Sequence, residues 1–379
     1  MSYKLNEILL LSVLFSATLL GSQSPTPSDA QALESQGKLR EAAAAWKSIA
    51  QRNPHDAAAF ASWGLVLSRQ EKFQEAAVAY RKALALNPKL PGIQLNLGLA
   101  EFKQQHFPQA VGPLRAALAA NPESMQARTL LGLCYYGTKQ FSEAVKFLKP
   151  VALADPGNTE LHQLLAQSCL WAKDNECALK EFQQILQQNP NSAAAHMLLG
   201  EALDGLERTA EAIEEFQAAI KVAPREPGIH FGLGYLYRKS HQYEEAKVAF
   251  EAEYGIDPSN ALALAYVGDI EWKMNNPDQA LVTLKKAVQQ KNDLRIAYAD
   301  MGAIYLDQKQ YDAAVAAFQR AIQLDPEQPD MYFRLGHVYQ AMGNMPAAEK
   351  QYAKFRALHK KADEDLMKMM SDAPPALHP

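Results

Sequence analysis

Glycine recurs along this chain with a period of 34 residues, and this regularity restricts the fold more than any other feature of the sequence. The glycines that share one slot of the period are Gly64, Gly98, Gly132, Gly200, Gly234, Gly268, Gly302 and Gly336. Ala166 fills the one slot in this series that lacks a glycine, and an alanine follows each slot after twelve residues. Self-similarity at a fixed period of this length predicts an array of repeated units instead of one globular core.

Each unit predicts two helices. When the glycine is numbered position 8, the residues at positions 4, 7, 8 and 11 share one helical face, and those at 20, 24 and 27 share a face of a second helix. Small residues at 8, 20 and 27 let the two helices approach, while position 24 supplies a large side chain. Asn or Asp before proline, as at Asn53-Pro54 and Asp325-Pro326, predicts the end of the second helix. Asn292 and Lys360 replace this proline in two units.

The order of residues within a unit is distinctive. In the unit that begins at Arg295 the residues are Tyr298, Met301, Gly302, Tyr305, Ala314, Phe318 and Pro326. This spacing of a large residue, a residue-glycine pair, tyrosine, alanine, phenylalanine and proline resembles the tetratricopeptide repeat (TPR). The resemblance implies an all-α chain, a right-handed superhelical solenoid of stacked helix-turn-helix units with a C-terminal capping helix.

The period also predicts where the units begin and end. Residues 57–362 carry nine tandem units, and residues 23–56 carry a degenerate first unit with Trp46 in the expected place. Residues 363–370 continue the helical pattern and suit a capping segment with a polar outer face. We expect residues 371–379, which contain three prolines, to be disordered.

The N-terminus differs from the repeats. Ile8–Leu20 is a run of 13 residues without charge, preceded by Lys4 and followed by the Ser/Pro-rich segment 21–28. This length predicts a signal peptide over residues 1–22 and an exported, periplasmic or secreted protein. Glu7 and the absence of a small-x-small cleavage site leave an uncleaved N-terminal anchor as the alternative.

Composition and motifs exclude several functions. A net charge of −4 and a pI near 6.2 provide no basic surface for nucleic acid. The sequence contains no Gly-rich phosphate loop, no Gly-x-Ser-x-Gly elbow, no His-Glu-x-x-His motif and no Cys-x-x-Cys pair. We therefore expect no catalytic residue, no cofactor and no metal, so that the chain is not an enzyme.

His162, His196 and His230 occupy position 4 of three consecutive units. Adjacent helices pack about 8–10 Å apart, which is too far for side chains in this ladder to share one zinc ion, so we expect half-buried packing histidines. Cys169 and Cys177 flank one predicted turn. They suit either a disulfide in an oxidising compartment or two buried thiols.

The resemblance further implies that the first helix of each unit lines a concave groove, with positions 2, 5, 6, 9, 12 and 13 facing a bound peptide. The candidate residues of the early units are Leu65, Leu95, Leu99, Phe102, Leu130, Leu133 and Tyr136. The middle of the groove is acidic, with Glu201 and Asp204. The candidates of the later units are Phe231, Tyr235, Arg238, Lys239, Tyr266, Asp269, Trp272, Lys273, Phe333, Arg334 and His337. The Lys/Asn clamp of chaperone-binding TPRs is missing, because Ala61, Gln126 and Leu130 stand where it requires polar or basic residues.

These expectations favour a non-catalytic scaffold that binds a protein or peptide segment in its groove, in the cell envelope. We expect no nucleic-acid partner and no membrane contact beyond the possible N-terminal anchor. Two alternatives remain open at this point. The chain could recruit substrates as the accessory arm of an enzyme complex, such as a glycosyltransferase, or it could be a structural envelope protein that self-associates.

Overall fold

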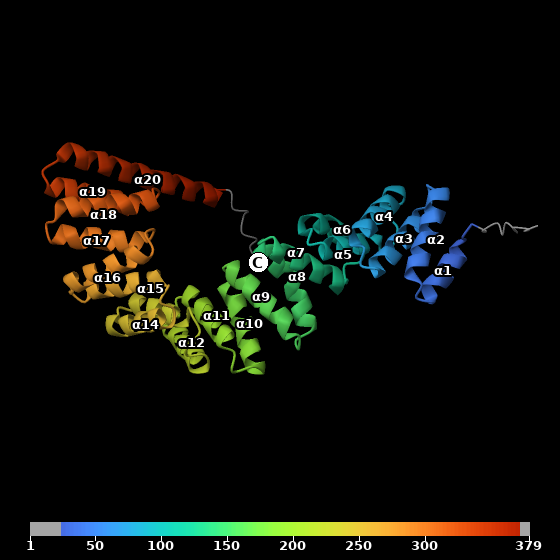
Figure 1. The fold of residues 1–379 in the computed structure, drawn as a ribbon, viewed down its shortest axis with the longest axis horizontal. Helices are drawn as coiled ribbons and strands as arrows, with labels where there is room; N and C mark the ends of the chain where they lie inside the picture. Colours follow the sequence, from blue (N-terminus) through green and yellow to red (C-terminus); the bar gives the residue numbers. More distant parts are fainter. Residues whose placement is uncertain (1–23, 372–379) are drawn as a thin grey trace, which may run out of the picture. The chain divides into compact units, whose positions relative to one another are not determined.

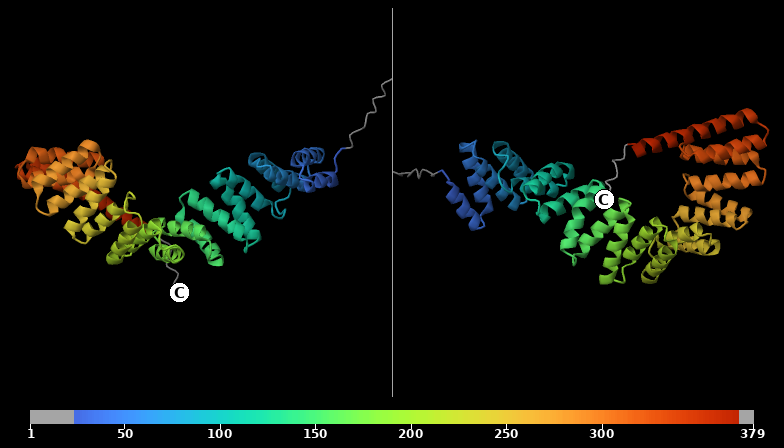
Figure 2. Two further views of the ribbon diagram at one scale, coloured as in Figure 1. Left: turned by 60° about the horizontal axis from the view of Figure 1, so that its bottom comes forward. Right: turned by 180° about the vertical axis from the view of Figure 1, so that it is seen from behind.

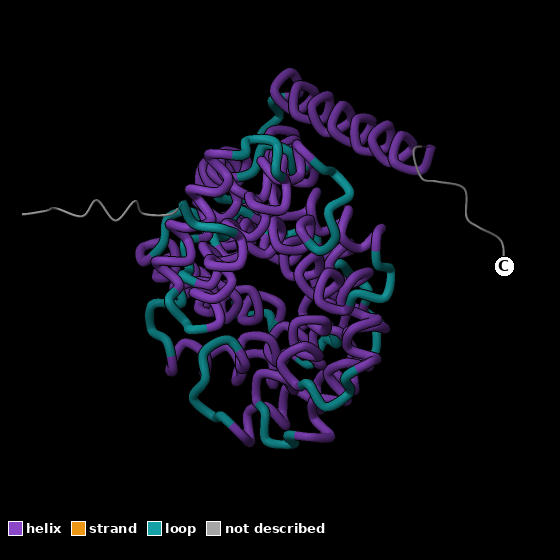
Figure 3. The backbone as a smooth tube through the Cα atoms, turned by 90° about the vertical axis from the view of Figure 1, so that its right-hand side faces the viewer, coloured by secondary structure: helices purple, strands orange, loops and turns teal. Residues whose placement is uncertain are grey.

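The computed structural model describes residues 24–371, so the predicted signal segment and most of the predicted disordered tail lie outside the described residues. Within this range the chain forms twenty α-helices and no strand, as the purple helices and teal loops of Figure 3 show. The prediction of an all-α repeat fold is confirmed.

The chain divides into two compact units, residues 1–154 and 155–379, which we call the N-terminal and C-terminal units. The helices of the N-terminal unit are α1 (Pro27–Ser35), α2 (Leu39–Arg52), α3 (Ala57–Arg69), α4 (Phe73–Leu86), α5 (Ile93–Lys103), α6 (Phe107–Ala120), α7 (Met125–Gly137) and α8 (Phe141–Ala154). The C-terminal unit begins with α9 (Thr159–Trp171), α10 (Asn175–Gln188), α11 (Ala193–Gly205), α12 (Thr209–Val222), α13 (Ile229–Lys239) and α14 (Tyr243–Ile256). It continues with α15 (Ala261–Lys273), α16 (Pro277–Gln290), α17 (Arg295–Asp307), α18 (Tyr311–Leu324), α19 (Pro329–Ala341) and α20 (Met345–Ser371).

The helices pack as hairpins. Each odd-numbered helix contacts the even-numbered helix that follows it, and within each unit the next hairpin packs against the previous one (Figure 1). We call the odd-numbered helix the first helix of its repeat and the even-numbered helix the second. Because each amphipathic hairpin buries its apolar side against its neighbours, the core of each unit is a series of adjoining clusters.

The glycine slot lies at the contact between the two helices of a hairpin. A Cβ atom added to Gly132 would lie 2.4 Å from the Leu148 side chain, and one added to Gly234 would lie 3.0 Å from the Phe250 ring. Leu148 and Phe250 both occupy position 24 and are fully buried. The predicted approach of a small residue at position 8 to a large one at position 24 is confirmed.

Position 27 departs from the predicted small residue in four repeats, and in one of them it is charged: Glu253 of α14, which is buried. Its Oε1 accepts a hydrogen bond from the Gly228 backbone N–H at 2.8 Å, and its Oε2 accepts one from Phe231 at 3.2 Å. Gly228 precedes α13 and has no side chain with which to cap that helix. Glu253 therefore caps the free N–H groups at the start of α13, which offsets the cost of burying its charge.

The turn inside each hairpin has a left-handed residue at one fixed position. Glu71, Gln105, Lys139, Lys173, Glu207, His241, Asn275 and Lys309 all have a φ near +60°. The same position is glycine at Gly37 and Gly343, in the first and last hairpins. This conformation ends the first helix, since the residue that follows it donates its N–H back to that helix, as Lys72 does to the Leu67 carbonyl at 3.0 Å.

Helix boundaries follow the polar residues between repeats. Asp56, Ser124 and Asn158 accept backbone hydrogen bonds at the starts of α3, α7 and α9. Asn87 ends α4 directly before Pro88, as the Asn-Pro and Asp-Pro pairs predict.

The last helix, α20, is 27 residues long and includes both the second helix of the last repeat and the predicted capping segment. The right-hand view of Figure 2 shows it continuing beyond α19. The segment 363–370 is thus part of one continuous helix instead of a separate one. None of the described helices combines the length and apolar character that crossing a membrane requires.

Candidate functional site

Within each unit, first helices of successive repeats also touch one another. In the N-terminal unit α3 contacts α5 and α5 contacts α7, and in the C-terminal unit α11 contacts α13, α15 contacts α17 and α17 contacts α19. These first helices line one side of each unit, which we call the first-helix face. All predicted groove residues lie on first helices.

In the N-terminal unit this face carries Leu65 on α3, which is 43% exposed. Phe102 of α5 is half-buried, and its ring lies 5.6 Å from that of Phe107 on α6. Tyr136 of α7 is also half-buried and lies 6.0 Å from Phe141 on α8. Phe102 and Tyr136 thus support their own hairpins as well as the surface, whereas Leu65 is the more accessible side chain.

Leu95, Leu99 and Leu133 are half-buried. Leu95 lines a hollow of about 450 Å³ between the loop Pro88–Gly92 and the end of α6. Leu130, in contrast, is only 8% exposed. It therefore contributes little surface to the first-helix face.

In the C-terminal unit the most accessible predicted residue is Tyr235 of α13, which is 42% exposed. Tyr235 lines a hollow of about 230 Å³ together with Glu201 and Asp204 of α11. Gly232, one turn before Tyr235, lines the same hollow and contributes no side chain to fill it. An aromatic ring therefore lies beside two carboxylates at a recess in the first-helix face.

Arg238 is held in a charged network. Its Nε donates to Asp269 Oδ2 of α15 at 2.5 Å, and its guanidinium lies 5.6 Å from the centre of the Tyr266 ring. Lys273 lies 3.5 Å from the other oxygen of Asp269. Asp269 is almost fully buried, so its charge is balanced by both cations.

Trp272 packs against apolar clusters built from α15 to α19, and it is only half-buried. Lys273 Nζ lies 5.8 Å from the centre of its ring. Its role in a groove stays a prediction, because much of its surface already contacts the core.

A further charged residue of this face, Asp300 of α17, was absent from the sequence candidates. It is 9% exposed, and its Oδ2 lies buried without a hydrogen-bond partner among the described residues. Burial, with a smaller contribution from the negative charge of Asp269, raises the pKa of Asp300 to about 8. The signal in the sequence is that Asp300 occupies position 6 of its repeat, one of the positions predicted to face a bound peptide.

Two buried glutamates occupy position 11, where four of the other repeats carry tyrosine. Glu101 pairs with Arg81 and with His106, whose Nδ1 lies 3.2 Å from Glu101 Oε2. Glu271 accepts a hydrogen bond from Thr283 at 2.7 Å and lies 3.1 Å from Lys247. These carboxylates are balanced by partners inside their own hairpins and from the preceding helix, which indicates a structural role.

The histidine ladder consists of separate contacts. His162 Nδ1 lies 2.5 Å from Glu181 Oε2, and His196 Nδ1 lies 2.6 Å from Glu215 Oε2. His230 has Ala249 in the corresponding place and contacts the Pro224 carbonyl oxygen at 3.1 Å through Nε2. Across residues 24–371, no group of three or more His, Cys, Asp and Glu side chains is arranged to hold a metal ion.

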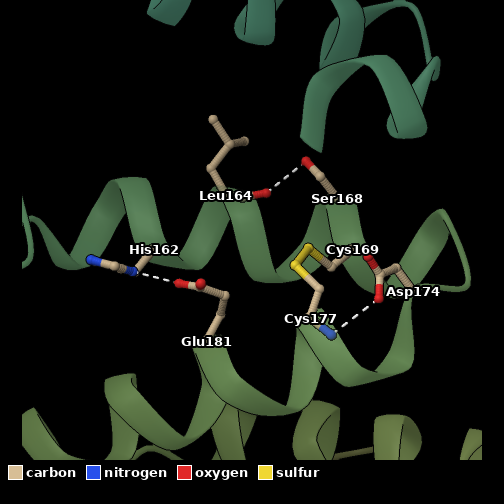
Figure 4. Close-up of a disulfide and its surroundings, with 7 residues drawn as sticks. All are labelled: His162, Leu164, Ser168, Cys169, Asp174, Cys177 and Glu181. Carbon is tan, nitrogen blue, oxygen red and sulfur yellow. Dashed lines mark hydrogen bonds and ion pairs between the residues drawn. A yellow bond between two sulfur atoms is a disulfide. The ribbon is translucent and has the colours of Figure 1, made fainter. Parts of the chain in front are cut away.

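Cys169 and Cys177 form a disulfide that joins α9 to α10 across their turn, with a Cα–Cα distance of 5.7 Å (Figure 4). Asp174 caps α10 beside it, accepting the Cys177 N–H at 3.1 Å. Of the two possibilities left open by the sequence, the structure contains the bridge. The third cysteine, Cys134, is buried, and burial raises the pKa of its thiol to about 11.

Known sequences and structures agree with this architecture. Sequence models described as TPR repeat match residues 64–105 and 302–343, and models described as tetratricopeptide repeat match residues 107–168, 172–228 and 202–261. Among curated proteins, none matches this chain.

Three solved structures are similar to the chain but share little sequence with it. A tetratricopeptide repeat protein from Parabacteroides merdae ATCC 43184 is 17% identical with a TM-score of 0.50, over 65% of this chain and 97% of that one. YrrB, described as a TPR protein with an unusual peptide-binding site, is 20% identical with a TM-score of 0.38, over 50% and 97% of the two chains. MamA is 20% identical with a TM-score of 0.40, over 44% and 97%.

The family matches lie within the helical hairpins of the structure and together span more than half of the sequence. With the packing of position 8 against position 24, they show that this chain belongs to the tetratricopeptide repeat family.

Proposed function

We propose that this chain is a non-catalytic scaffold that binds a protein or peptide segment along its first-helix face. The observation that carries the proposal is that Leu65 and Tyr235 lie on this face with more than two fifths of their surface exposed. Neither position is needed to close its own hairpin, which the residues at 4, 7, 8 and 11 do. Exposed aromatic and apolar side chains beside recesses commonly anchor partners.

The TPR family supports a protein or peptide partner, since its members generally act as scaffolds, and YrrB is described as a TPR protein with an unusual peptide-binding site. Several buried carboxylates of the described residues form ion pairs between helices, as at Asp269 and Glu271. Such pairs stabilise the array, which favours a structural role for these charges.

The proposal is tested by truncating one exposed anchor in each unit. Leu65→Ala and Tyr235→Ala should each weaken partner binding by about 2 kcal/mol, or roughly thirtyfold, if the side chain is an anchor. Val78→Ala and Val248→Ala are matched controls, because these valines are 60% and 67% exposed but lie on the second helices α4 and α14. Affinity of the native partner, isolated from the envelope fraction, is measured by titration calorimetry.

The results distinguish the first-helix face from the second helices as the binding surface. Loss of binding in the Leu65 and Tyr235 variants, with both controls unchanged, supports the first-helix face. Equal losses in the valine variants, or none in any variant, would contradict it. Phe102→Ala and Tyr136→Ala are less suitable as probes, because both rings pack on their own hairpins and truncation would also lower stability.

We further propose that the chain works in the cell envelope. The uncharged run Ile8–Leu20 and the Cys169–Cys177 bridge support this location, since disulfides persist in oxidising compartments. Mass spectrometry of the protein isolated from its native cells, with thiols alkylated at lysis, tests both features. An intact Met1–Leu20 segment with three alkylated cysteines in the cytoplasmic fraction would overturn this proposal.

A further inference from the structure

Asp300 occupies an unusual place on the first-helix face of the C-terminal unit. It lies at the position of α17 that corresponds to Tyr266 on α15 and Arg334 on α19. Its side chain is nine-tenths buried and Oδ2 has no partner among the described residues. A buried polar atom left unpaired costs about 1–3 kcal/mol, so it points to a group that the chain itself does not supply.

The charges around Asp300 are mostly positive. The charges of Arg238 on α13, Lys273 on α15 and Arg334 on α19 lower the pKa of Asp300, against the carboxylate of Asp269, which raises it. Asp269 is already committed, since its two oxygens face Arg238 and Lys273. Arg334 is exposed and forms no hydrogen bond or ion pair with another described residue. The site therefore holds positive charge in excess of what Asp269 neutralises.

The neighbours of Asp300 on its own helix have small side chains. Ala299 is half-buried and Ala303 is buried. Arg334 is exposed and the side chain of Lys273 is partly exposed, so these two cations are the accessible groups beside Asp300.

We propose that Asp300, Lys273 and Arg334 form a subsite that binds the carboxylate of an aspartate or glutamate side chain in the bound segment. Asp300 donates its O–H to the ligand carboxylate, and the two cations balance the ligand's charge. A cationic side chain would instead face three positive groups. The inference rests on the proposed function, because it describes which segment the first-helix face binds.

Binding at this subsite depends on pH with a definite sign. With its pKa raised to about 8, Asp300 is mostly protonated at pH 6.5 and carries a negative charge at pH 9. The same burial that affects Asp300 raises the pKa of Tyr266 above its ordinary value of 10, so this phenol stays neutral over the range. Ionised Asp300 repels a carboxylate, and affinity for an acidic segment should fall as the pH rises.

The experiment selects ligands without assuming a partner. A random library of 12-residue peptides is selected for binding to the full-length protein at pH 6.5. The selected peptides that also bind the Tyr235→Ala variant are kept as a separate pool. We expect the selected peptides to be enriched in Asp and Glu. The strongest peptide is then synthesised with amidated C-terminus, alongside a version in which Gln replaces each acidic residue.

Three variants identify the subsite by fluorescence polarisation. Arg334→Gln should weaken the acidic peptide about tenfold, since it removes a charged donor. Lys350→Gln on α20 changes the net charge equally at an exposed lysine elsewhere and should leave affinity unchanged. Asp300→Asn should keep binding at pH 6.5, because the amide also donates a hydrogen bond, but should abolish the fall in affinity between pH 6.5 and 9.

The outcomes distinguish the inference from the function on which it rests. If peptides bind but the Gln version binds equally well, or affinity rises with pH, or Arg334→Gln has no effect, the carboxylate subsite is wrong and the scaffold function stands. If the selection yields no peptide that binds better than to an unrelated surface, both are contradicted.

Discussion

The buried carboxyl group of Asp300 should make the stability of the C-terminal unit depend on pH. Folding raises its pKa from about 3.9 to about 8, so the native state binds more protons than the unfolded chain between these values. The contribution is fully present below about pH 4 and is lost as the pH rises towards 8. The slope in this window is at most about 1.4 kcal/mol per pH unit.

Asp300→Asn removes this titration. Urea unfolding at pH 5 and at pH 8 should show that the stability of the variant relative to the wild type increases with pH. Asp307→Asn, an exposed change on the same helix, is the control and should show no such trend. A constant difference between wild type and Asp300→Asn across this range would mean that the carboxyl is not buried in solution.

Gly234 tests the contact on which every hairpin depends. The fully buried ring of Phe250 lies directly beside Gly234, and a Cβ atom added to this glycine would lie only 3.0 Å from that ring. Gly234→Leu should therefore overpack the α13–α14 hairpin and lower the free energy of unfolding by about 1–3 kcal/mol. Thermal unfolding followed by circular dichroism measures the loss. An unchanged midpoint would show that the two helices do not meet at this slot.

At the level of the helix pair, the turn imposes a backbone constraint that is independent of packing. Gly343 has a φ of +76° and free space around the position of a Cβ, so Gly343→Ala changes only the strain of the left-handed conformation. We expect a loss of about 1 kcal/mol. Gly255 in α14 also has free space but helical dihedrals, so Gly255→Ala should stabilise by about 0.5–1 kcal/mol.

Opposite signs for these two glycine-to-alanine changes in urea unfolding would confirm the constraint. Equal effects would indicate that the last turn relaxes out of the left-handed conformation. Lys139 and Lys309 tolerate the same conformation without being glycine. This is why the sequence shows no glycine signal there and the left-handed turn could not be predicted from residue types.

The helix pairs could be predicted because their determinants are local and repeated. Gly132 and Leu148 are sixteen residues apart in one hairpin, and the same pair of slots recurs throughout the array. The features that escaped prediction depend on adjacent elements. Glu253 is buried because it caps another helix, and Asp300 is defined by charges on α13, α15 and α19. Such contacts between elements do not recur with the 34-residue period, so the repeat pattern does not predict them.

For the predicted groove residues, too, the helix could be predicted from the sequence but the exposure of each side chain could not. The resemblance to the family correctly placed all of them on first helices, but it does not report how far each side chain is exposed. Leu65 and Leu130 were equivalent as apolar first-helix residues, yet one is 43% exposed and the other 8%. Exposure depends on the neighbouring repeat, which differs in sequence from one repeat to the next.

For the molecule as a whole, a repeat array predicts stability that varies with the number of neighbours. Interior helices are covered on both sides, whereas α1 packs mainly against α2 and α20 extends past the helix that covers it. In such arrays opening begins where a unit lacks a neighbour. We expect amide hydrogen exchange to be fastest in α1 and in the last turns of α20, and slowest in helices such as α4 and α16, whose cores include the fully buried Tyr80 and Leu284. Exchange measured by mass spectrometry on the full chain tests this order. Equal protection of α1 and α4 would show that the chain unfolds as a single cooperative body instead of as a repeat array.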